Sequence, residues 1–297
     1  MLEPGLEPSI SLELDFYRKF MDRILKIINN TPKEISSFIN SYYRIRFEDL
    51  NLKRIFRGKI SESTPERIIE TLIPVPPLGV TSYVDLAKAK NIEELLELLK
   101  GSKYDQISKL ASEYKRTQST QLLEQELDKI TSKEIILVSK SLKKSEQNIV
   151  FKIIGLETDV ENFLLAVKIR RSIPNNAPFK ANDVFPNTYN IKLEILEKLA
   201  RGGNLEDAIK SLPPPFNEML QPILTGDVAL IRSWLRSQIY KTVVVGRSKN
   251  DYGFNPIIAY LVYAEIEKDD LVAIAWAKEQ GIPTDQFMKY LILLNNK

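Results

Sequence analysis

Apolar residues recur every three or four positions along most of the chain, as in 93-EELLELLKG-101 and 191-IKLEILEKLARG-202. This spacing places apolar side chains on one face of an α-helix. Glycine, which weakens helices, occurs only 11 times in 297 residues. Proline-containing segments at 73–79, 172–187 and 213–215 interrupt the pattern, because proline cannot continue a helix. The pattern predicts an all-α protein with joints at these three segments.

One helical pattern, which we call motif A, occurs three times and is centred on Asn51, Asn162 and Asp270. The first two centres are 111 residues apart and the last two are 108 residues apart. An acidic residue lies three positions before each centre, and a basic residue lies eight positions after it. Apolar residues occupy the first, fourth and fifth positions after each centre. The three copies are 47-FEDLNLKRIFRGK-59, 158-TDVENFLLAVKIR-170 and 266-IEKDDLVAIAWAK-278, with acidic residues Glu48, Asp159 and Glu267.

A second pattern, motif B, occurs twice between the copies of motif A. The stretch 85-DLAKAKNIEELLELLKGSKY-104 is echoed by 198-KLARGGNLEDAIKSLPPPF-216, with an offset of 113 residues at the Leu-Ala pair and at the Asn. In each copy we expect one helix to end and the Asn to cap a second helix. The chain therefore reads A-B-A-B-A. We predict three repeat domains at 1–78, 79–186 and 187–297, the first incomplete at its N-terminus.

The charges of motif A suggest a helix with an acidic residue near its start and a basic residue near its end, which suits the helix dipole. The apolar positions form a stripe that we expect to pack inward. Asparagine in mid-helix is costly when buried without partners, so two interpretations of Asn51 and its equivalents stay open. Either the amide bonds to a neighbouring loop or helix, which we prefer, or it contacts a ligand.

Several of these stretches together resemble the C subunit of archaeal and bacterial A/V-type ATPases, a relative of the eukaryotic d subunit. The resemblance runs from about Leu12 to Leu294. Its motifs are 48-EDLNLKRIFRGK-59, 66-ERIIETLIP-74, 85-DLAKAKNIEELLELLKGSKY-104 and 255-NPIIAYLVYAEIEKDDLVAIAWAKEQGIP-283.

The chain departs from the family pattern at three places. Asp270 stands where the family usually has Asn, and Trp276 where it usually has Arg. Family members also typically begin with a further B-like helical pair before the first motif A. We therefore expect an exposed apolar face on the first helices of this chain.

The resemblance implies a funnel of three all-helical domains with pseudo-threefold symmetry. In the family, this protein sits on the proteolipid ring at the cytoplasmic side of the membrane and receives the central shaft. It transmits torque that couples ATP hydrolysis or synthesis to proton or sodium transport, and it is not an enzyme. The resemblance thus implies the ring and the shaft subunits as partners and no cofactor.

The composition of the chain also excludes several kinds of active site. The chain contains no Cys and no His, which removes thiolate nucleophiles, imidazole bases and Cys/His zinc sites. A net charge of +3 does not indicate nucleic-acid binding. The longest uncharged apolar run, at 256–264, is too short to span a bilayer, and the N-terminus does not resemble a signal peptide. We expect a peripheral protein without a small-molecule substrate.

Two alternatives to the rotary ATPase component remain open. One is a helical-repeat adaptor that binds other proteins along a concave surface. The other is an enzyme that uses 157-ETDVE-161 or 265-EIEKDD-270 as an acid/base or metal cluster, although such clusters more often start helices. Four basic residues near the ends of the A helices are candidate contacts to a partner, namely Arg57, Lys59, Arg170 and Arg171.

Overall fold

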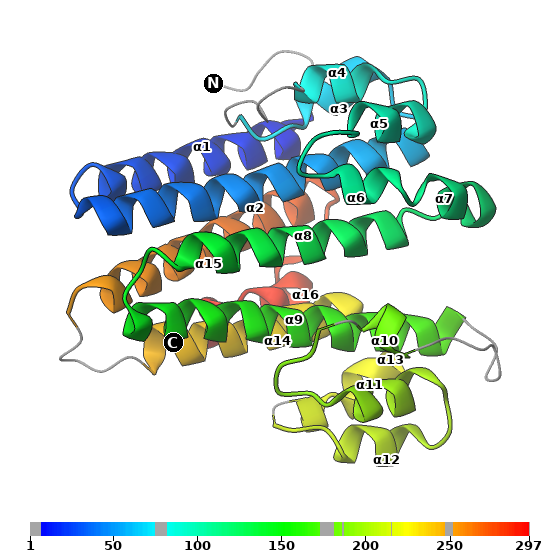
Figure 1. The fold of residues 1–297 in the computed structure, drawn as a ribbon. Coiled ribbons are helices and arrows are strands. Elements are labelled where there is room, and N and C mark those ends of the chain that lie inside the picture. The colour runs from blue at the N-terminus through cyan, green and yellow to red at the C-terminus, as the bar shows by residue number, and fades with distance from the viewer. Residues whose placement is uncertain are drawn as a thin grey trace. The chain divides into compact units, whose positions relative to one another are not determined.

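The computed structural model describes residues 7–74, 82–172, 181–185, 187–214, 216–246 and 252–296. All regular secondary structure in these ranges is helical, which confirms the all-α prediction (Figure 1). The chain divides into two compact units, Met1–Lys143 and Lys144–Lys297. This division follows packing rather than the sequence repeat, and the three repeat domains at 1–78, 79–186 and 187–297 remain a prediction.

Unit 1 is built on three long helices: α1, α2 and α8. α2 contacts both α1 and α8, and the shorter helices α3 to α7 connect α2 to α8 in the chain. The bounds are α1 Pro8–Ile28, α2 Lys33–Ile60, α3 Pro65–Glu70, α4 Tyr83–Lys88, α5 Ile92–Leu98, α6 Asp105–Ser108, α7 Ala111–Thr117 and α8 Gln121–Ser139.

Unit 2 is also built on three long helices: α9, α14 and α15. α9 contacts α11, α14 and α15, so it lies at the centre of the unit. The bounds are α9 Lys144–Ser172, α10 Ala181–Val184, α11 Leu193–Ala200, α12 Leu205–Lys210, η1 Phe216–Glu218, α13 Leu220–Thr225, α14 Val228–Tyr240, the π-helix η2 Lys241–Val245, α15 Phe254–Glu279, α16 Thr284–Phe287, η3 Met288–Tyr290 and η4 Leu294–Asn296.

Each copy of motif A lies in the C-terminal half of a long helix: α2, α9 or α15. The acidic residue of the motif is therefore about four turns from the helix start, not near it. The expectation that Glu48, Asp159 and Glu267 mark helix starts is wrong for this reason. The basic residues do lie in the last turns, as predicted, at Lys59, Arg170, Arg171 and Lys278.

The two Asn residues of motif B cap their helices as predicted. The Asn91 side chain accepts a hydrogen bond from the Glu94 amide at the start of α5, at 2.9 Å. The Asn204 side chain accepts one from the Glu206 amide at the start of α12, also at 2.9 Å. These bonds satisfy amides that the first turn of a helix otherwise leaves without partners.

The apolar side of α1 is buried rather than exposed. Tyr17 and Phe20 make edge-on ring contacts with Phe47 of α2, and Phe20 also contacts Tyr43. Ring pairs with this geometry add to the stability gained from burial alone. Among the large apolar residues of α1, Leu25 is exposed. The predicted exposed apolar face on the first helices is therefore wrong.

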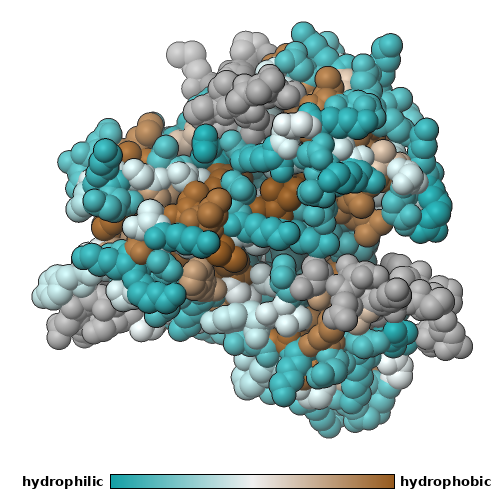
Figure 2. Space-filling model, in the orientation of Figure 1, coloured by the Kyte–Doolittle hydropathy of each residue, from teal (hydrophilic) through white to brown (hydrophobic). Residues whose placement is uncertain are grey.

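Polar side chains cover most of the face seen in Figure 2, and apolar groups interrupt them over the region of α8. The exposed apolar residues of α8 are Ile136 and Leu137, at 39% and 55%. Within the described ranges, no helix combines the length and apolar character needed to cross a membrane.

Candidate functional site

The centre of each motif A binds the backbone of a segment that follows its own helix. In the first copy, the buried Asn51 amide donates to the Ile73 carbonyl at 2.9 Å and accepts from the Ile73 amide at 2.8 Å. In the second copy, Asn162 donates to the Asn187 carbonyl at 2.7 Å. The partners lie 22 and 25 residues downstream. The side chain therefore fastens the returning chain to the long helix.

The third copy does the same with a carboxylate. Asp270 accepts hydrogen bonds from the amides of Ile292 and Leu293, at 2.9 and 2.8 Å. A carboxylate only accepts, so it binds two amides where Asn51 binds one amide and one carbonyl. Burial raises the pKa of Asp270, and the two backbone amides oppose that rise. The substitution of Asp for the usual Asn thus keeps a polar role at this position.

The acidic residues three positions earlier are placed differently in the three copies. Glu48 is buried and accepts from the Tyr104 hydroxyl at 3.0 Å and from the Lys103 ammonium. Asp159 is fully buried and accepts from the backbone amides of residues 189–191. Burial raises the pKa of Asp159, and these amides oppose the rise. Glu267 of α15 is half-buried.

The basic residues eight positions after the centre bind the end of the first helix in motif B. The Lys59 ammonium donates to the carbonyls of Ala87 and Ala89, at the end of α4. The Arg170 guanidinium donates to the carbonyls of Leu199, at 3.2 Å, and Gly203, at 2.6 Å, at the end of α11. Helix C-termini leave carbonyls without partners and carry partial negative charge. A cation at this repeat position therefore fixes motif B to motif A.

The two other candidate contact residues also have partners inside their own units. Arg57 forms a two-pronged ion pair with Glu124 of α8, at 3.0 and 2.6 Å, while 65% of its side chain stays exposed. Arg171 donates to the Ile223 carbonyl of α13 at 2.6 Å. Contact of Arg57, Lys59, Arg170 or Arg171 with another protein stays a prediction.

Further ion pairs join the long helices within each unit. In unit 1, Lys53 of α2 pairs with Asp49 of the same helix and with Asp128 of α8. Burial lowers the pKa of Lys53, but the two carboxylates outweigh burial and raise it. In unit 2, Arg236 of α14 pairs with Asp269 of α15 at 2.5 Å. Such partly buried pairs fix the relative register of the helices more than they add net stability.

The Asp269 carboxylate also accepts from its neighbour Lys268, at 2.7 Å. Burial by itself raises the pKa of Asp269, but Arg236 and Lys268 outweigh burial and hold this pKa at about 2, below the ordinary 3.8. The acidic stretch 265–270 therefore supplies structural ion pairs and a backbone anchor. Within the described ranges, no group of three or more acidic residues is arranged to hold a metal ion.

The match to a known family spans all of the repeat positions described above. The family of ATP synthase (C/AC39) subunits matches residues 9–290. The chain belongs to this family.

Individual relatives are distant but are matched over most of their length. The A-type ATP synthase C subunit of Archaeoglobus fulgidus is 24% identical over 262 residues, which cover 87% of this chain and 73% of the relative. The equivalent protein of Methanosarcina mazei is 22% identical over 273 residues, covering 91% and 73%. That of Methanobrevibacter smithii is 25% identical over 275 residues, covering 88% and 69%.

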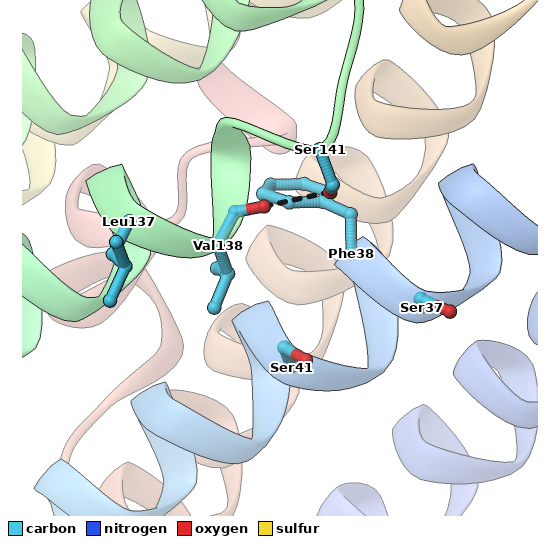
Figure 3. A pocket seen from close by; sticks show the side chains of 6 residues that line it. All are labelled: Ser37, Phe38, Ser41, Leu137, Val138 and Ser141. Carbon is cyan, nitrogen blue, oxygen red and sulfur yellow. Dashed lines mark hydrogen bonds between the residues drawn. The ribbon is translucent and has the colours of Figure 1, made fainter.

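A small open pocket lies between α2 and α8 of this ATP synthase family member (Figure 3). Its volume is about 330 Å³, and one lining side chain, the Ser141 hydroxyl, donates to the Val138 carbonyl at 2.8 Å. None of the lining residues is charged, so they supply no carboxylate or ammonium group for acid/base catalysis. The lining residues are Ser37, Phe38, Ser41, Leu137, Val138 and Ser141.

The sequence predicts the repeated positions but not their hydrogen-bond partners. The partners are backbone groups of Ile73, Asn187 and Ile292. Backbone groups are the same in every residue, so the side chains at these positions give no sequence signal. The one usable signal is that each partner lies a similar distance after its motif A centre, in a segment that follows the helix end. The anchoring ion pairs Lys53–Asp128 and Arg236–Asp269 gave no signal, since a chain with 27% charged residues offers many equivalent pairings.

Proposed function

We propose that the protein is the coupling component of the central stalk in a rotary A/V-type ATPase or ATP synthase. It would form a socket that joins the proteolipid ring of the membrane sector to the central shaft. The observation that carries this proposal is the family match across residues 9–290, together with relatives named as the C subunit of A-type ATP synthases.

The side-chain chemistry supports a mechanical role. The polar groups at the repeat positions bind backbone groups of their own chain, so their hydrogen-bonding capacity is used to hold helices and connections together. Ion pairs between α2 and α8 and between α14 and α15 resist sliding of one helix along the other. A part that transmits torque needs this resistance, and it needs no nucleophile or cofactor.

In this proposal the protein is peripheral and lies on the cytoplasmic side of the membrane, and torque passing through it couples ATP turnover to ion transport. Its pseudo-threefold funnel would derive from the three copies of motif A, one in each of the predicted repeat domains. Arg57 is the candidate contact with the most exposed side chain and is the first residue to substitute in an interface test.

Co-migration with the two expected partners tests the proposal. The purified chain is mixed with detergent-solubilised proteolipid ring and, separately, with shaft subunits, and each mixture is separated by size-exclusion chromatography. We expect the chain to co-migrate with both. Migration of the chain apart from ring and shaft, at concentrations where it is folded by circular dichroism, overturns the proposed function.

A further inference from the structure

The contact between α2 and α8 changes character along its length. Three side-chain pairs join the two helices over the C-terminal half of α2, namely Asp49–Thr131, Lys53–Asp128 and Arg57–Glu124. Over the N-terminal half of α2, Ser37 and Ser41 lie beside α8, and their short side chains form no hydrogen bond to α8 within the described ranges. The pocket of about 330 Å³ lies at this end of the contact.

The carbon atoms that line this pocket belong mainly to three apolar side chains. Phe38 is 1% exposed and extends from α2 towards the end of α8 that carries Val138 (Figure 3). Leu137 lines the opening and is 55% exposed, and its neighbour Ile136 is 39% exposed. Two apolar side chains thus project into solvent beside an opening that leads to further apolar surface.

Basic side chains accompany the pocket on both helices. On each helix, one basic residue lies three or four positions before a lining residue and another lies three or four positions after one, a spacing that places them on the same helix face. These residues are Lys33 and Arg44 on α2, and Lys133 and Lys140 on α8. All four are exposed, and their side chains form no ion pair or hydrogen bond with another described residue.

Acidic side chains are fewer in the same region. Within four positions of the lining residues, unit 1 carries five basic residues, Lys143 being the fifth, and two acidic residues, Glu34 and Glu134. Glu34 is exposed and Glu134 is half-buried. The local excess of three positive charges equals the net charge of +3 of the whole chain. Positive charge is therefore concentrated around this pocket.

We propose that the surface of a membrane containing anionic phospholipids binds here. The contact is made by six residues that we call the pocket rim: Lys33, Arg44, Lys133, Ile136, Leu137 and Lys140. Ile136 and Leu137 enter the boundary between headgroups and lipid tails, as the apolar face of an interfacial helix does. The four basic side chains pair with lipid phosphates, and the pocket admits the first carbons of one lipid tail towards Phe38.

The chemistry of the pocket rim favours a membrane over other occupants. A second copy of the chain would bring the same excess of positive charge, and like charges facing each other oppose association. A stable protein interface commonly uses about 20–30 residues a side, far more than two exposed apolar residues and their basic neighbours. A soluble anion would leave Ile136 and Leu137 in water. This inference goes beyond the proposed socket role and rests on the geometry and charge of unit 1 alone.

Vesicle sedimentation with the full chain tests the proposal. The purified chain is mixed with vesicles of phosphatidylcholine alone or of phosphatidylcholine with phosphatidylglycerol, and the bound fraction is pelleted. We expect binding to the anionic vesicles to be about tenfold tighter or more, because several basic side chains approach the charged surface. Added salt should weaken this binding, since it screens the charges.

A fluorophore attached to a single cysteine locates the contact, because the chain contains no native cysteine. Leu137→Cys is labelled with a dye whose emission shifts to the blue when it leaves water, and anionic vesicles are added. We expect a blue shift at position 137. The matched control is Ile60→Cys, at a residue that is 44% exposed and lies about 28 Å along α2 from Ser41, where the emission should stay unchanged.

Substitutions separate the apolar and the charged parts of the contact. Leu137→Asp should weaken binding to anionic vesicles about tenfold or more, because a carboxylate replaces an inserting side chain. The double variant Lys133→Glu, Lys140→Glu should weaken it at least as much, because it reverses two charges. Ile60→Asp is the control and should bind as the unsubstituted chain does. Circular dichroism verifies that each variant is folded.

Four results overturn the proposal. The first is equal binding to neutral and anionic vesicles, and the second is unchanged emission at position 137. The third is equal binding by Leu137→Asp and the unsubstituted chain. The fourth is tighter binding to soluble poly-glutamate than to anionic vesicles, since an acidic protein would then be the occupant. None of these measurements involves the proteolipid ring or the shaft, so failure here leaves the co-migration test unaffected.

Discussion

Asn51 and Ile73 exchange two hydrogen bonds across 22 residues of chain, and both groups are buried. The amide side chain of Asn51 satisfies the amide and the carbonyl of one residue in a segment that has left the helix. Buried backbone groups need partners, and a loop has no helix or sheet to supply them. At this point of unit 1, the Asn51 side chain therefore supplies the two backbone hydrogen bonds that a helix or sheet would otherwise supply.

Replacing Asn51 with Ala should destabilise the protein by about 2–4 kcal/mol, because both backbone groups of Ile73 lose their partners. Urea unfolding followed by circular dichroism measures the change. The matched control is Asn40→Ala, an exposed position of the same helix, where we expect a change within about 0.5 kcal/mol. Equal stability of the two variants would contradict the anchoring role.

Lys59→Met should cost about 1 kcal/mol, since the carbonyls of Ala87 and Ala89 lose a charged donor. Methionine keeps most of the apolar length of the side chain, so the change in stability reports the loss of the ammonium group alone. The internal control is Lys278→Met at the equivalent position, which has no described partner and should change stability by less than about 0.5 kcal/mol in the isolated chain. Thermal unfolding compares the two. A larger loss for Lys278→Met would refute the assignment.

Gly58→Ala should destabilise unit 1 although alanine favours helices. A Cβ at Gly58 would lie 2.6 Å from Cγ1 of Ile68, which is buried and has little room to move. We expect a net loss of about 1–2 kcal/mol, the overpacking cost minus the helix-propensity gain. In Gly155→Ala the new Cβ meets the ring of Tyr189, which is 48% exposed and can swing outward, so the loss should be smaller. The reverse order, measured by urea unfolding, would argue against this packing.

The ion pairs of Asp269 should give the protein a defined acid sensitivity. Its pKa is about 2 in the folded protein and 3.8 ordinarily. A lowered pKa contributes stability above pH 3.8, and this contribution is lost as the pH falls from 3.8 towards 2. Asp269→Asn should therefore be less stable than the unsubstituted protein at pH 6, and the difference should shrink between pH 4 and pH 2.

Urea unfolding at pH 6, 4, 3 and 2 measures the difference. The control is Asn40→Ala, at an exposed residue of α2 without a titratable side chain, for which the difference should not vary with pH in this way. A difference for Asp269→Asn that is constant from pH 6 to pH 2 would show that Asp269 is not held in its charged form by Arg236 and Lys268.

Sequence patterns predicted local features well where the cause is local. Helical periodicity predicts an all-α fold, and Asn91 and Asn204 cap helices because their side chains reach amides only two or three residues away. The starts of α2, α9 and α15 were missed because the charges of motif A imitate a helix N-terminus. Glu48 and Asp159 are instead buried in mid-helix, where the Tyr104 hydroxyl and the amides of residues 189–191 satisfy them.

Features that depend on distant chain segments could not be predicted. The sequence places Asn51, Asn162 and Asp270 in register, but their backbone partners are defined by where the chain returns after each long helix. Exposure of Leu271 is a further example. Leu271 has the same repeat position as Leu52 and Phe163, which pack against the helices of motif B, but its own side chain is 39% exposed.

The most direct measurement of the proposed role is ATP-driven ion uptake into vesicles that carry the rotary complex assembled with and without this chain. The proposal predicts that ATP hydrolysis continues without the chain, whereas ion uptake requires it and returns when the purified chain is added back. Equal uptake with and without the chain would contradict the coupling role.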